Sequence, residues 1–432
     1  MKKIIKSYWI VAVSAVALFA ASCGHGGYNG QLLGVLDRPE WIMEIPYGMV
    51  YVHSGTLHVG PSDQDINAAM VQRPRSITVP GFFMDNTEIT NNEYRQFTNW
   101  VRDSIAHKLM GDDYLLDPGG EHERVNWEKE IDWSTDDAKE KLADLMYDDQ
   151  NSFWGQKAVD PGKLWYEFVY IDWKEAAKKE NRDKPRSTFL KNNYIRIYPD
   201  TLCWIHDYTY AYNEPLTRNY YSHPAFDNYP VVGVNWKQAK AFAIWRTRFM
   251  NDFNRQNARV DAEDFRLPNE SEWEYAARGG HDNSPYPWGG PYLRNAKGCI
   301  LANFKPMRGN YLEDGGVYTV KADAYFPNDF GLYNMAGNVS EWCEDIYYEN
   351  AYAFTHDLSS AIKYDAKDGK ENEGGDNPAM KRKVLRGGSW KDVGYKLQCG
   401  TREWEFQDTA KCYIGFRCIQ SFLGRSLSDI QK

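Results

Sequence analysis

The sequence is short of the residues that hold most protein-bound transition metals. Its 432 residues include seven cysteines and nine histidines, with no two cysteines in CxxC spacing and no two histidines in HxxxH spacing. Zinc sites need three or four such ligands, usually at short, regular spacings. The sequence therefore gives no support to a zinc site.

Long apolar runs and excess positive charge are also missing. Apart from one N-terminal stretch, no apolar run approaches the about 20 residues that span a bilayer, and the mean hydropathy is -0.67. The 51 lysines and arginines are outnumbered by 60 aspartates and glutamates, which gives a net charge of -9. An acidic chain repels the phosphate backbone of nucleic acids. These features exclude a polytopic membrane protein and argue against nucleic acid as a partner.

Aromatic residues are abundant instead. Tyrosine, tryptophan and phenylalanine make up 15% of the chain, and the hydrophobic fraction is 42%. A chain of this length and hydrophobicity can bury a sizeable core, and large amphipathic rings suit a loop-rich fold better than long regular elements. Disorder, long helical bundles and coiled coils are therefore poor descriptions of this protein.

The N-terminus has the pattern of an export signal. Three lysines precede an apolar stretch, residues 8–21, that is too short to cross a bilayer. The sequence Ala-Ala-Ser before Cys23 resembles the lipobox of bacterial lipoproteins. We therefore predict a signal peptide over residues 1–22, lipidation of Cys23 and a tether over residues 23–46, because several acyl chains on one residue anchor a protein durably. The alternative is an ordinary cleaved signal peptide followed by an unmodified cysteine.

Six cysteines remain beyond the tether. They are Cys203, Cys299, Cys343, Cys399, Cys412 and Cys418. An exported protein can form disulfides, and six cysteines allow fifteen complete pairings. The sequence does not select among them, and partial pairing or free buried thiols remain equally open.

Two extended segments and a helix are expected near the start of the body. Residues 49–60 alternate apolar and polar side chains as in a strand, and residues 76–84 form a second extended stretch. Thr90 or Asn91 can cap a helix that runs to about Arg102.

From about residue 103 to 222 the chain changes to charge-rich stretches mixed with aromatics, which we interpret as an insertion. Beyond it, Asn235 is the expected N-cap of one helix, and Asn269 is the expected N-cap of another. Residues 286–342 are rich in glycine, asparagine, aspartate and proline and predict irregular loops. Residues 363–383 predict a charged surface loop.

Six ordered segments of the chain match one known protein family. The stretch Arg-Leu-Pro-Asn-Glu-Ser-Glu-Trp-Glu-Tyr-Ala-Ala-Arg-Gly-Gly ends at Gly280, and the segments together are residues 88–94, 230–236, 266–280, 331–342, 386–390 and 415–417. They resemble the formylglycine-generating, or sulfatase-modifying, enzyme family. The resemblance implies an α+β fold, loop-rich, low in regular secondary structure and related to the C-type lectin fold. We predict one such domain over residues 47–423, with the insertion at about 103–222 and a tail at 424–432.

The family's catalytic residues are missing from this sequence. Enzymes that it resembles oxidise a substrate cysteine with two cysteines of their own, which hold copper just after the Gly-Gly-Ser motif. Here Ser389 is followed by Trp390 and then by Lys-Asp-Val-Gly-Tyr-Lys-Leu, with no cysteine, and the first thiol, Cys399, comes too late. Cu(I) needs soft thiolate ligands. The HxxxHxE triad of the related iron-dependent sulfoxide synthases is absent as well, so we predict no catalytic residues.

The resemblance also implies structural calcium, which takes hard oxygen ligands. One family site corresponds to Asn334, Gly337, Val339 and Glu341. A second corresponds to Asn303, Phe304, Asp314 and Gly316, with a shorter loop and a loose last match. The alternative is that Asn334 and Glu341 only hydrogen-bond the turn. We predict no required cofactor, with calcium as an optional structural ion.

Part of the insertion narrows the resemblance. Residues 198–217 and 223–230 resemble the GldK/PorK family of gliding-motility lipoproteins of the type IX secretion system, and the sister lipoprotein GldJ shares much of the pattern. This implies a lipid-anchored scaffold on the periplasmic face of the outer membrane that assembles, with self-association, into a large ring with a GldN/PorN-type periplasmic protein. The alternatives are an active oxidase of the fold and a calcium-dependent, lectin-like ligand binder.

Overall fold

The computed structural model describes residues 43–60, 73–120, 123–148, 150–152, 157–207, 209–210, 213–306, 313, 316–367 and 374–424. The predicted signal peptide, Cys23 and residues 425–432 of the predicted tail lie outside these residues. Residues Ile45–Leu423 form one compact unit. Within the described ranges, no helix has both the length and the apolar character that a membrane crossing requires.

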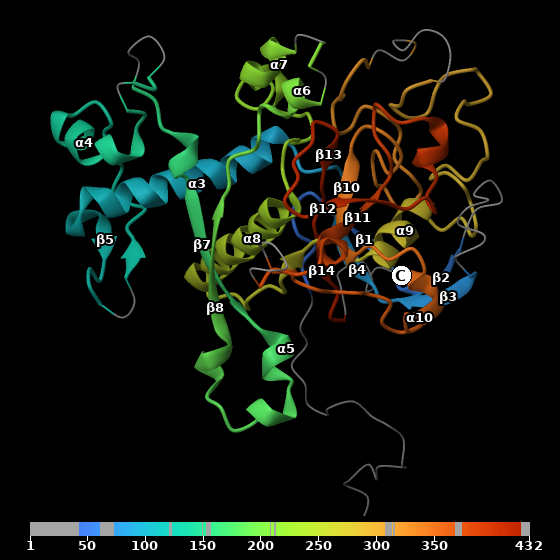
Figure 1. The fold of residues 1–432 in the computed structure, drawn as a ribbon, viewed down its shortest axis with the longest axis horizontal. Helices are drawn as coiled ribbons and strands as arrows, with labels where there is room; N and C mark the ends of the chain where they lie inside the picture. Colours follow the sequence, from blue (N-terminus) through green and yellow to red (C-terminus); the bar gives the residue numbers. More distant parts are fainter. Residues whose placement is uncertain are drawn as a thin grey trace, which may run out of the picture. The chain divides into compact units, whose positions relative to one another are not determined.

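Two four-stranded sheets lie at the centre of this unit (Figure 1). The first has the order β1–β4–β14–β9, with bounds Met49–Val52, Phe82–Asp85, Ile419–Ser421 and Phe265–Arg266. The second has the order β12–β11–β10–β13, with bounds Glu403–Phe406, Arg382–Arg386, Ser340–Ile346 and Ile414–Gly415. Strand β10 pairs antiparallel with β11 and parallel with β13. The C-terminal part of the chain thus supplies strands to both sheets.

The two extended segments predicted near the start are each divided between two sheets. Residues 49–60 contain β1 and β2 (Gly55–Val59), and β1 pairs with β4 whereas β2 pairs with β3 (Arg75–Val79). The second segment breaks between β3 and β4 at Pro80, whose missing N–H cannot extend a ladder. The extended backbone was predicted correctly, but each segment contains two strands and not the single strand that we predicted.

Helices α3 (Asn91–Met110) and α8 (Trp236–Gln256) begin where their capping residues predict. Thr90 and Asn235 each form a capping box with the third helical residue. The predicted end of α3 near Arg102 is wrong, because Val101, Ala106 and Met110 remain buried and keep the helix packed for two further turns. The two helices meet through aromatic rings, with Tyr94 stacked on Phe242 at 5.5 Å.

Helix α9 (Glu270–Arg278) is the third predicted helix, and its start and end are confirmed. Asn269 and Glu272 form its capping box, and Gly279 ends it with φ +60°. Its Trp273 is fully buried at the centre of a hydrophobic core that draws on β2, β3, β4 and β10. This helix therefore ties the N-terminal strands to the second sheet.

The region predicted to be an insertion contains short elements and one long hairpin. The short elements are β5 (Leu115–Leu116), β6 (Arg124–Val125), α4 (Asp136–Lys141), α5 (Trp173–Ala176), α6 (Cys203–His206) and α7 (Glu214–Asn219). The hairpin joins β7 (Trp165–Ile171) to β8 (Leu190–Arg196), and it is the long green ribbon beside α8 in Figure 1. One face of β7 packs on the core, since Tyr166 contacts Phe97 at 5.2 Å. The remaining helix, α10 (Ala351–Phe354), follows β10.

Candidate functional site at the Gly-Gly-Ser segment

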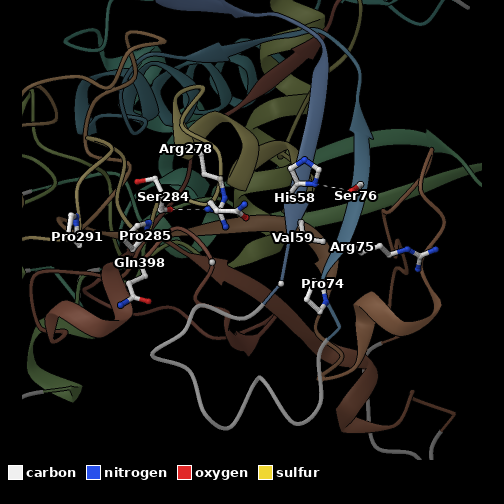
Figure 2. A pocket seen from close by; sticks show the side chains of 13 residues that line it. His58, Val59, Pro74, Arg75, Ser76, Arg278, Ser284, Pro285, Pro291 and Gln398 are labelled. Atoms are coloured by element: carbon white, nitrogen blue, oxygen red, sulfur yellow. Dashed lines mark hydrogen bonds between the residues drawn. The ribbon is translucent and has the colours of Figure 1, made fainter.

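A cavity of about 730 Å³ lies between the β2–β3 hairpin and the loop after α9 (Figure 2). Its lining includes the basic side chains of His58, Arg75 and Arg278. Arg278 is buried and is held by Glu274 and by the carbonyl oxygen of Ser284. None of residues 389–397 is among the described residues that line it. Gln398 and Gly400, which come directly after that segment, do line the cavity, so it borders the end of the segment.

The Gly-Gly-Ser segment itself forms a closed turn after β11. Gly388 adopts φ +67°, and a Cβ there would lie 2.8 Å from the carbonyl oxygen of Lys396, so only glycine suits this position. The Asp392 carboxylate accepts a hydrogen bond from the backbone N–H of Ser389 at 3.0 Å and a short one from the Ser389 hydroxyl. Ser389 and Asp392 are both buried. The Ser389 hydroxyl thus serves as a hydrogen-bond donor within the turn.

Aromatic side chains cover the next residue. Trp390 is stacked on Trp204 of α6 at 6.3 Å, with the rings 16° apart, and Tyr318 meets Trp390 edge-on at 5.1 Å. Trp204 is 1% exposed and Trp390 is 8% exposed. The predicted insertion therefore seals this side of the segment with its own tryptophan.

The end of the segment is equally committed to packing. Leu397 is fully buried in a cluster with Tyr286, Ala302 and Ala336. The ammonium of Lys391 lies 3.5 Å from the centre of the Tyr413 ring, a cation–π contact. Among residues 389–397, Ser389, Trp390, Asp392 and Leu397 are thus buried, and none of the nine is a cysteine.

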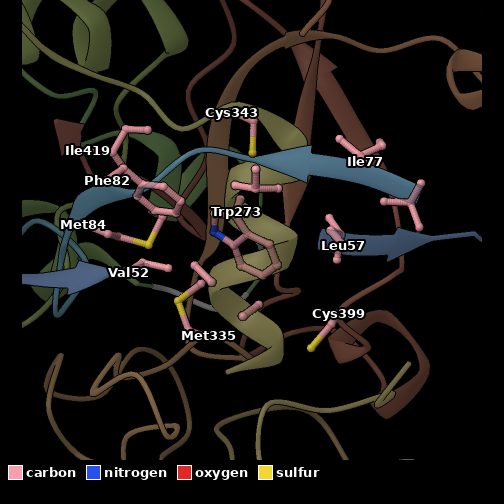
Figure 3. Close-up of a cluster of buried hydrophobic side chains, with 14 of the residues drawn as sticks. Val52, Leu57, Ile77, Phe82, Met84, Trp273, Met335, Cys343, Cys399 and Ile419 are labelled. Atoms are coloured by element: carbon pink, nitrogen blue, oxygen red, sulfur yellow. The ribbon is translucent and has the colours of Figure 1, made fainter. Parts of the chain in front are cut away.

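Cys399, the first cysteine after the segment, is part of the main hydrophobic core. Cys399 lies in the core around Trp273 (Figure 3) and is fully buried. Burial raises the pKa of Cys399 to about 12. A thiol with this pKa stays protonated at neutral pH, whereas copper and nucleophilic chemistry need the thiolate. The prediction that Cys399 does not replace the missing pair is consistent with its position.

Two other thiols do lie beside the segment, which the sequence did not reveal. Cys203 of α6 and Cys412 share a buried cluster with Trp390. Burial raises the pKa of both thiols well above the usual value, so neither is a thiolate at neutral pH. In the described part of the chain, no three or more His, Cys, Asp or Glu residues are grouped as metal ligands.

The residues predicted for the first calcium site lie around one loop, but Glu341 is already engaged. Its carboxylate accepts bonds from Arg417 at 2.6 and 2.7 Å and from the Trp273 indole at 2.7 Å. All three side chains are buried. The carboxylate is therefore neutralised by a guanidinium and does not fit the role of a calcium ligand.

Asn334, at the start of the same loop, has a side-chain oxygen that is not engaged in this way. Among the described residues, no hydrogen-bond donor reaches the buried Asn334 Oδ1, which fits an oxygen ligand. The Asn334 and Asn338 amide groups donate to Glu88, a buried carboxyl that the sequence did not single out. Burial raises the pKa of Glu88 to about 8 against the opposing charge of Arg417. The available signal was its place in residues 88–94, one of the segments that resemble the family. Gly337 and Val339 lie between Asn334 and Glu341 in the sequence, and only their backbone oxygens are available to a cation.

Three of the four residues predicted for the second calcium site surround one small cavity, and the nearby Glu313 carboxylate is paired with Arg294 at 2.7 Å. Asn303, Phe304 and Gly316 line a cavity of about 10 Å³ together with Glu313, a volume near the minimum for one water-sized occupant. Asp314 lies outside the described residues. Calcium at this site remains a prediction.

Comparison with known proteins places the chain in a family. Residues 43–422 match the model of the Sulfatase-modifying factor enzyme 1-like domain. The chain belongs to this family. Its fold is the loop-rich α+β fold of sulfatase-modifying factors, as predicted.

Relatives within the sulfatase-modifying factor family differ in activity. The formylglycine-generating enzyme of Mus musculus is 24% identical over 381 residues, which covers 87% of this chain and 75% of the mouse protein. The inactive C-alpha-formylglycine-generating enzyme 2 of Bos taurus is 32% identical over 246 residues, which covers 53% of this chain and 62% of the bovine protein. The family thus includes both enzymes and inactive members.

Among solved structures, PvdO from Pseudomonas aeruginosa resembles this sulfatase-modifying factor with a TM-score of 0.46 and 16% identity, covering 89% of this chain and 99% of PvdO.

Proposed function

We propose that this member of the family is not an enzyme and acts as a structural component of an assembly. The observation that carries the proposal is the packed segment 389–397, where Asp392 closes the turn and Trp204 covers Trp390. A copper-dependent oxidase needs an accessible pair of thiolates. This segment contains no thiol, and the side chains of its Asp392 and Leu397 are buried.

Copper binding tests this directly. The full chain is titrated with Cu(I) under reducing, oxygen-free conditions in competition with a colorimetric Cu(I) chelator. We expect no stoichiometric binding that competes with the chelator. A tight one-to-one complex that is lost in a Cys203→Ala or Cys412→Ala variant would contradict the proposal, and Cys299→Ala, at an exposed cysteine, is the matched control.

The finer proposal concerns the assembly. We infer that the chain is an outer-membrane lipoprotein, anchored through Cys23 on the periplasmic face, and a ring component of the type IX secretion or gliding-motility machinery with a GldN/PorN-type partner. The N-terminal signal pattern and the resemblance of residues 198–217 to the GldK/PorK family support it. A membrane-anchored protein without catalytic residues can still serve as a scaffold in such an assembly.

The solvent-facing side of the β7–β8 hairpin suits such a role. It carries Trp165, Val169, Ile171, Leu190 and Tyr194, which are between 40% and 57% exposed. Tyr194 is fixed by a hydrogen bond to Glu167, and Arg196 lies over Trp165 at 4.8 Å. Rigid, exposed aromatic and aliphatic side chains are typical of interface hot spots.

Affinity capture from outer membranes tests the assembly. We expect a stoichiometric periplasmic partner of the GldN/PorN type and large annular particles, and we expect Cys23→Ala to release the protein from the membrane. Val169→Glu on the hairpin should reduce the recovered partner, whereas Val260→Glu at a 66% exposed position is the matched control. Recovery of monomer alone, with no secretion defect on deletion, would contradict this role.

The 730 Å³ cavity favours one second candidate function, ligand binding. Its volume lies in the range of small-molecule sites, and its lining combines polar side chains such as His58 and Gln398 with prolines. Binding of glycans in an array, lost in His58→Ala with the fold intact, would support this candidate over the structural one.

A further inference from the structure

Two buried thiols from distant parts of the chain meet beside Trp390. Cys203 begins α6, and Cys412 stands two residues before β13, about 200 residues later. They are 2% and 0% exposed and belong to the same small cluster of buried side chains, with Trp204 and Val339. Ionisation of Cys412 would raise the pKa of Cys203 further, an effect second only to burial, because the two groups are close.

The backbone around the two cysteines is linked at two points. Asp207 donates its N–H to the Cys203 carbonyl at 3.2 Å, and its carboxylate accepts from the Cys412 N–H at 3.4 Å and thiol at 3.5 Å. Gly233 donates to the Lys411 carbonyl at 2.9 Å, and a Cβ on Gly233 would lie 3.2 Å from the Cys203 sulfur. These contacts hold the Cys203 and Cys412 segments together on both sides of the thiols.

The other described thiols have different surroundings. Cys343 and Cys399 lie on opposite sides of Trp273 in the main core (Figure 3). Cys418 is buried beside Asp85 and Arg246, and Cys299 is exposed. Among the described cysteines, the structure therefore favours Cys203 and Cys412 as a pair.

We propose that Cys203 and Cys412 form a disulfide in the oxidised protein, a covalent link between the inserted region and the last strands of the domain. The two thiols lose two protons and two electrons as the S–S bond forms. A second disulfide, on an oxidoreductase or on oxidised glutathione, accepts them by thiol–disulfide exchange and leaves as two thiols. Because both thiols are buried in the finished fold, the exchange takes place while the chain folds.

Peptide mapping tests this pair. The full chain is exported into an oxidising compartment, isolated without reductant, alkylated in denaturant and digested. We expect a linked peptide pair that contains Cys203 and Cys412 and disappears on reduction, while Cys343, Cys399 and Cys418 are alkylated. Full alkylation of Cys203 and Cys412, both in this material and after refolding with oxidised glutathione, would overturn the proposal, as would their linkage to other cysteines.

Thermal unfolding provides a second readout. A cross-link over a long loop stabilises mainly by restricting the unfolded chain, so reductant should lower the melting temperature of the wild type by about 5 °C or more. Cys412→Ala should lose this response and Cys418→Ala, the matched buried control, should keep it. A wild type that melts identically with and without reductant would overturn the disulfide but would leave the absence of copper chemistry untouched.

Discussion

Asp392 accepts hydrogen bonds from both the backbone N–H and the hydroxyl of Ser389, and this closes the turn that follows the Gly-Gly motif. Relatives that oxidise cysteine hold a thiol in this segment. Here a carboxylate stabilises the turn and the neighbouring rings of Trp390 and Trp204 fill the space beside it. The side chains of Ser389, Trp390 and Asp392 therefore have structural roles in this turn.

Asp392→Ala should therefore destabilise the protein without any effect on a metal. The buried Ser389 N–H loses its acceptor, which costs about 1–3 kcal/mol. Urea denaturation measures this loss. Asp408→Ala, which removes an exposed ion pair with Lys237, should cost less than about 1 kcal/mol. Equal losses in the two variants would show that the Ser389 turn is not stabilised in this way.

Trp204→Ala should destabilise the protein more strongly. It removes a buried ring that stacks on Trp390, and such large-to-small changes cost about 3–5 kcal/mol. Trp173→Ala, at a 71% exposed position, is the control and should be close to neutral. If chemical denaturation gave both variants the same midpoint, Trp204 would not be the cover that we describe.

Glu341→Gln distinguishes an ion-pair role from a calcium role. Removing the charge leaves the fully buried Arg417 without its carboxylate, which costs about 3–5 kcal/mol. Because the partner is Arg417, this loss should be the same in calcium and in a calcium chelator. A penalty that appears only in calcium-containing buffer would restore Glu341 as a metal ligand.

Lys383 gives a pH dependence with a definite sign. It is fully buried, donates to the Tyr364 carbonyl at 2.8 Å, and burial lowers its pKa to about 8. Between this value and the unfolded pKa near 10.5, the unfolded chain binds the proton and the folded chain does not, so stability rises with pH in this window and falls as pH drops through it.

Lys383→Met should remove this contribution. The difference in unfolding free energy between wild type and variant should change in favour of the wild type by about 2 kcal/mol from pH 8 to pH 9.5. Denaturant titrations at the two pH values measure it. Parallel slopes for the two proteins would mean that the pKa of Lys383 is not lowered.

Local signals predicted the helices well. The capping residues Thr90, Asn235 and Asn269 marked all three starts, because an N-cap is set by bonds within four residues. The end of α3 was missed, since long-range packing against buried residues such as Met110 extends it. The division of residues 49–60 between two sheets also depends on distant partners, β4 and β3, that no local pattern contains.

For the segment after the Gly-Gly motif, the sequence could predict only which catalytic residues are missing. The absence of thiols between Ser389 and Cys399 is visible in the sequence, whereas the cover by Trp204 and the meeting of Cys203 with Cys412 arise from contacts across the fold. Glu341 was predicted from a resemblance to a calcium site, and its ion pair with Arg417 depends on the pairing of β10 with β13, which places Arg417, just after β13, beside Glu341.

Oxidation of a cysteine-containing peptide tests the central claim most directly. The full chain is incubated with a sulfatase-type peptide, copper, oxygen and a thiol reductant, and conversion of the peptide cysteine to formylglycine is followed by mass spectrometry beside an active family enzyme. We predict no conversion above the protein-free control. Turnover by the wild type that disappears in Cys203→Ala or Cys412→Ala would contradict the structural role and identify an oxidase with relocated thiols.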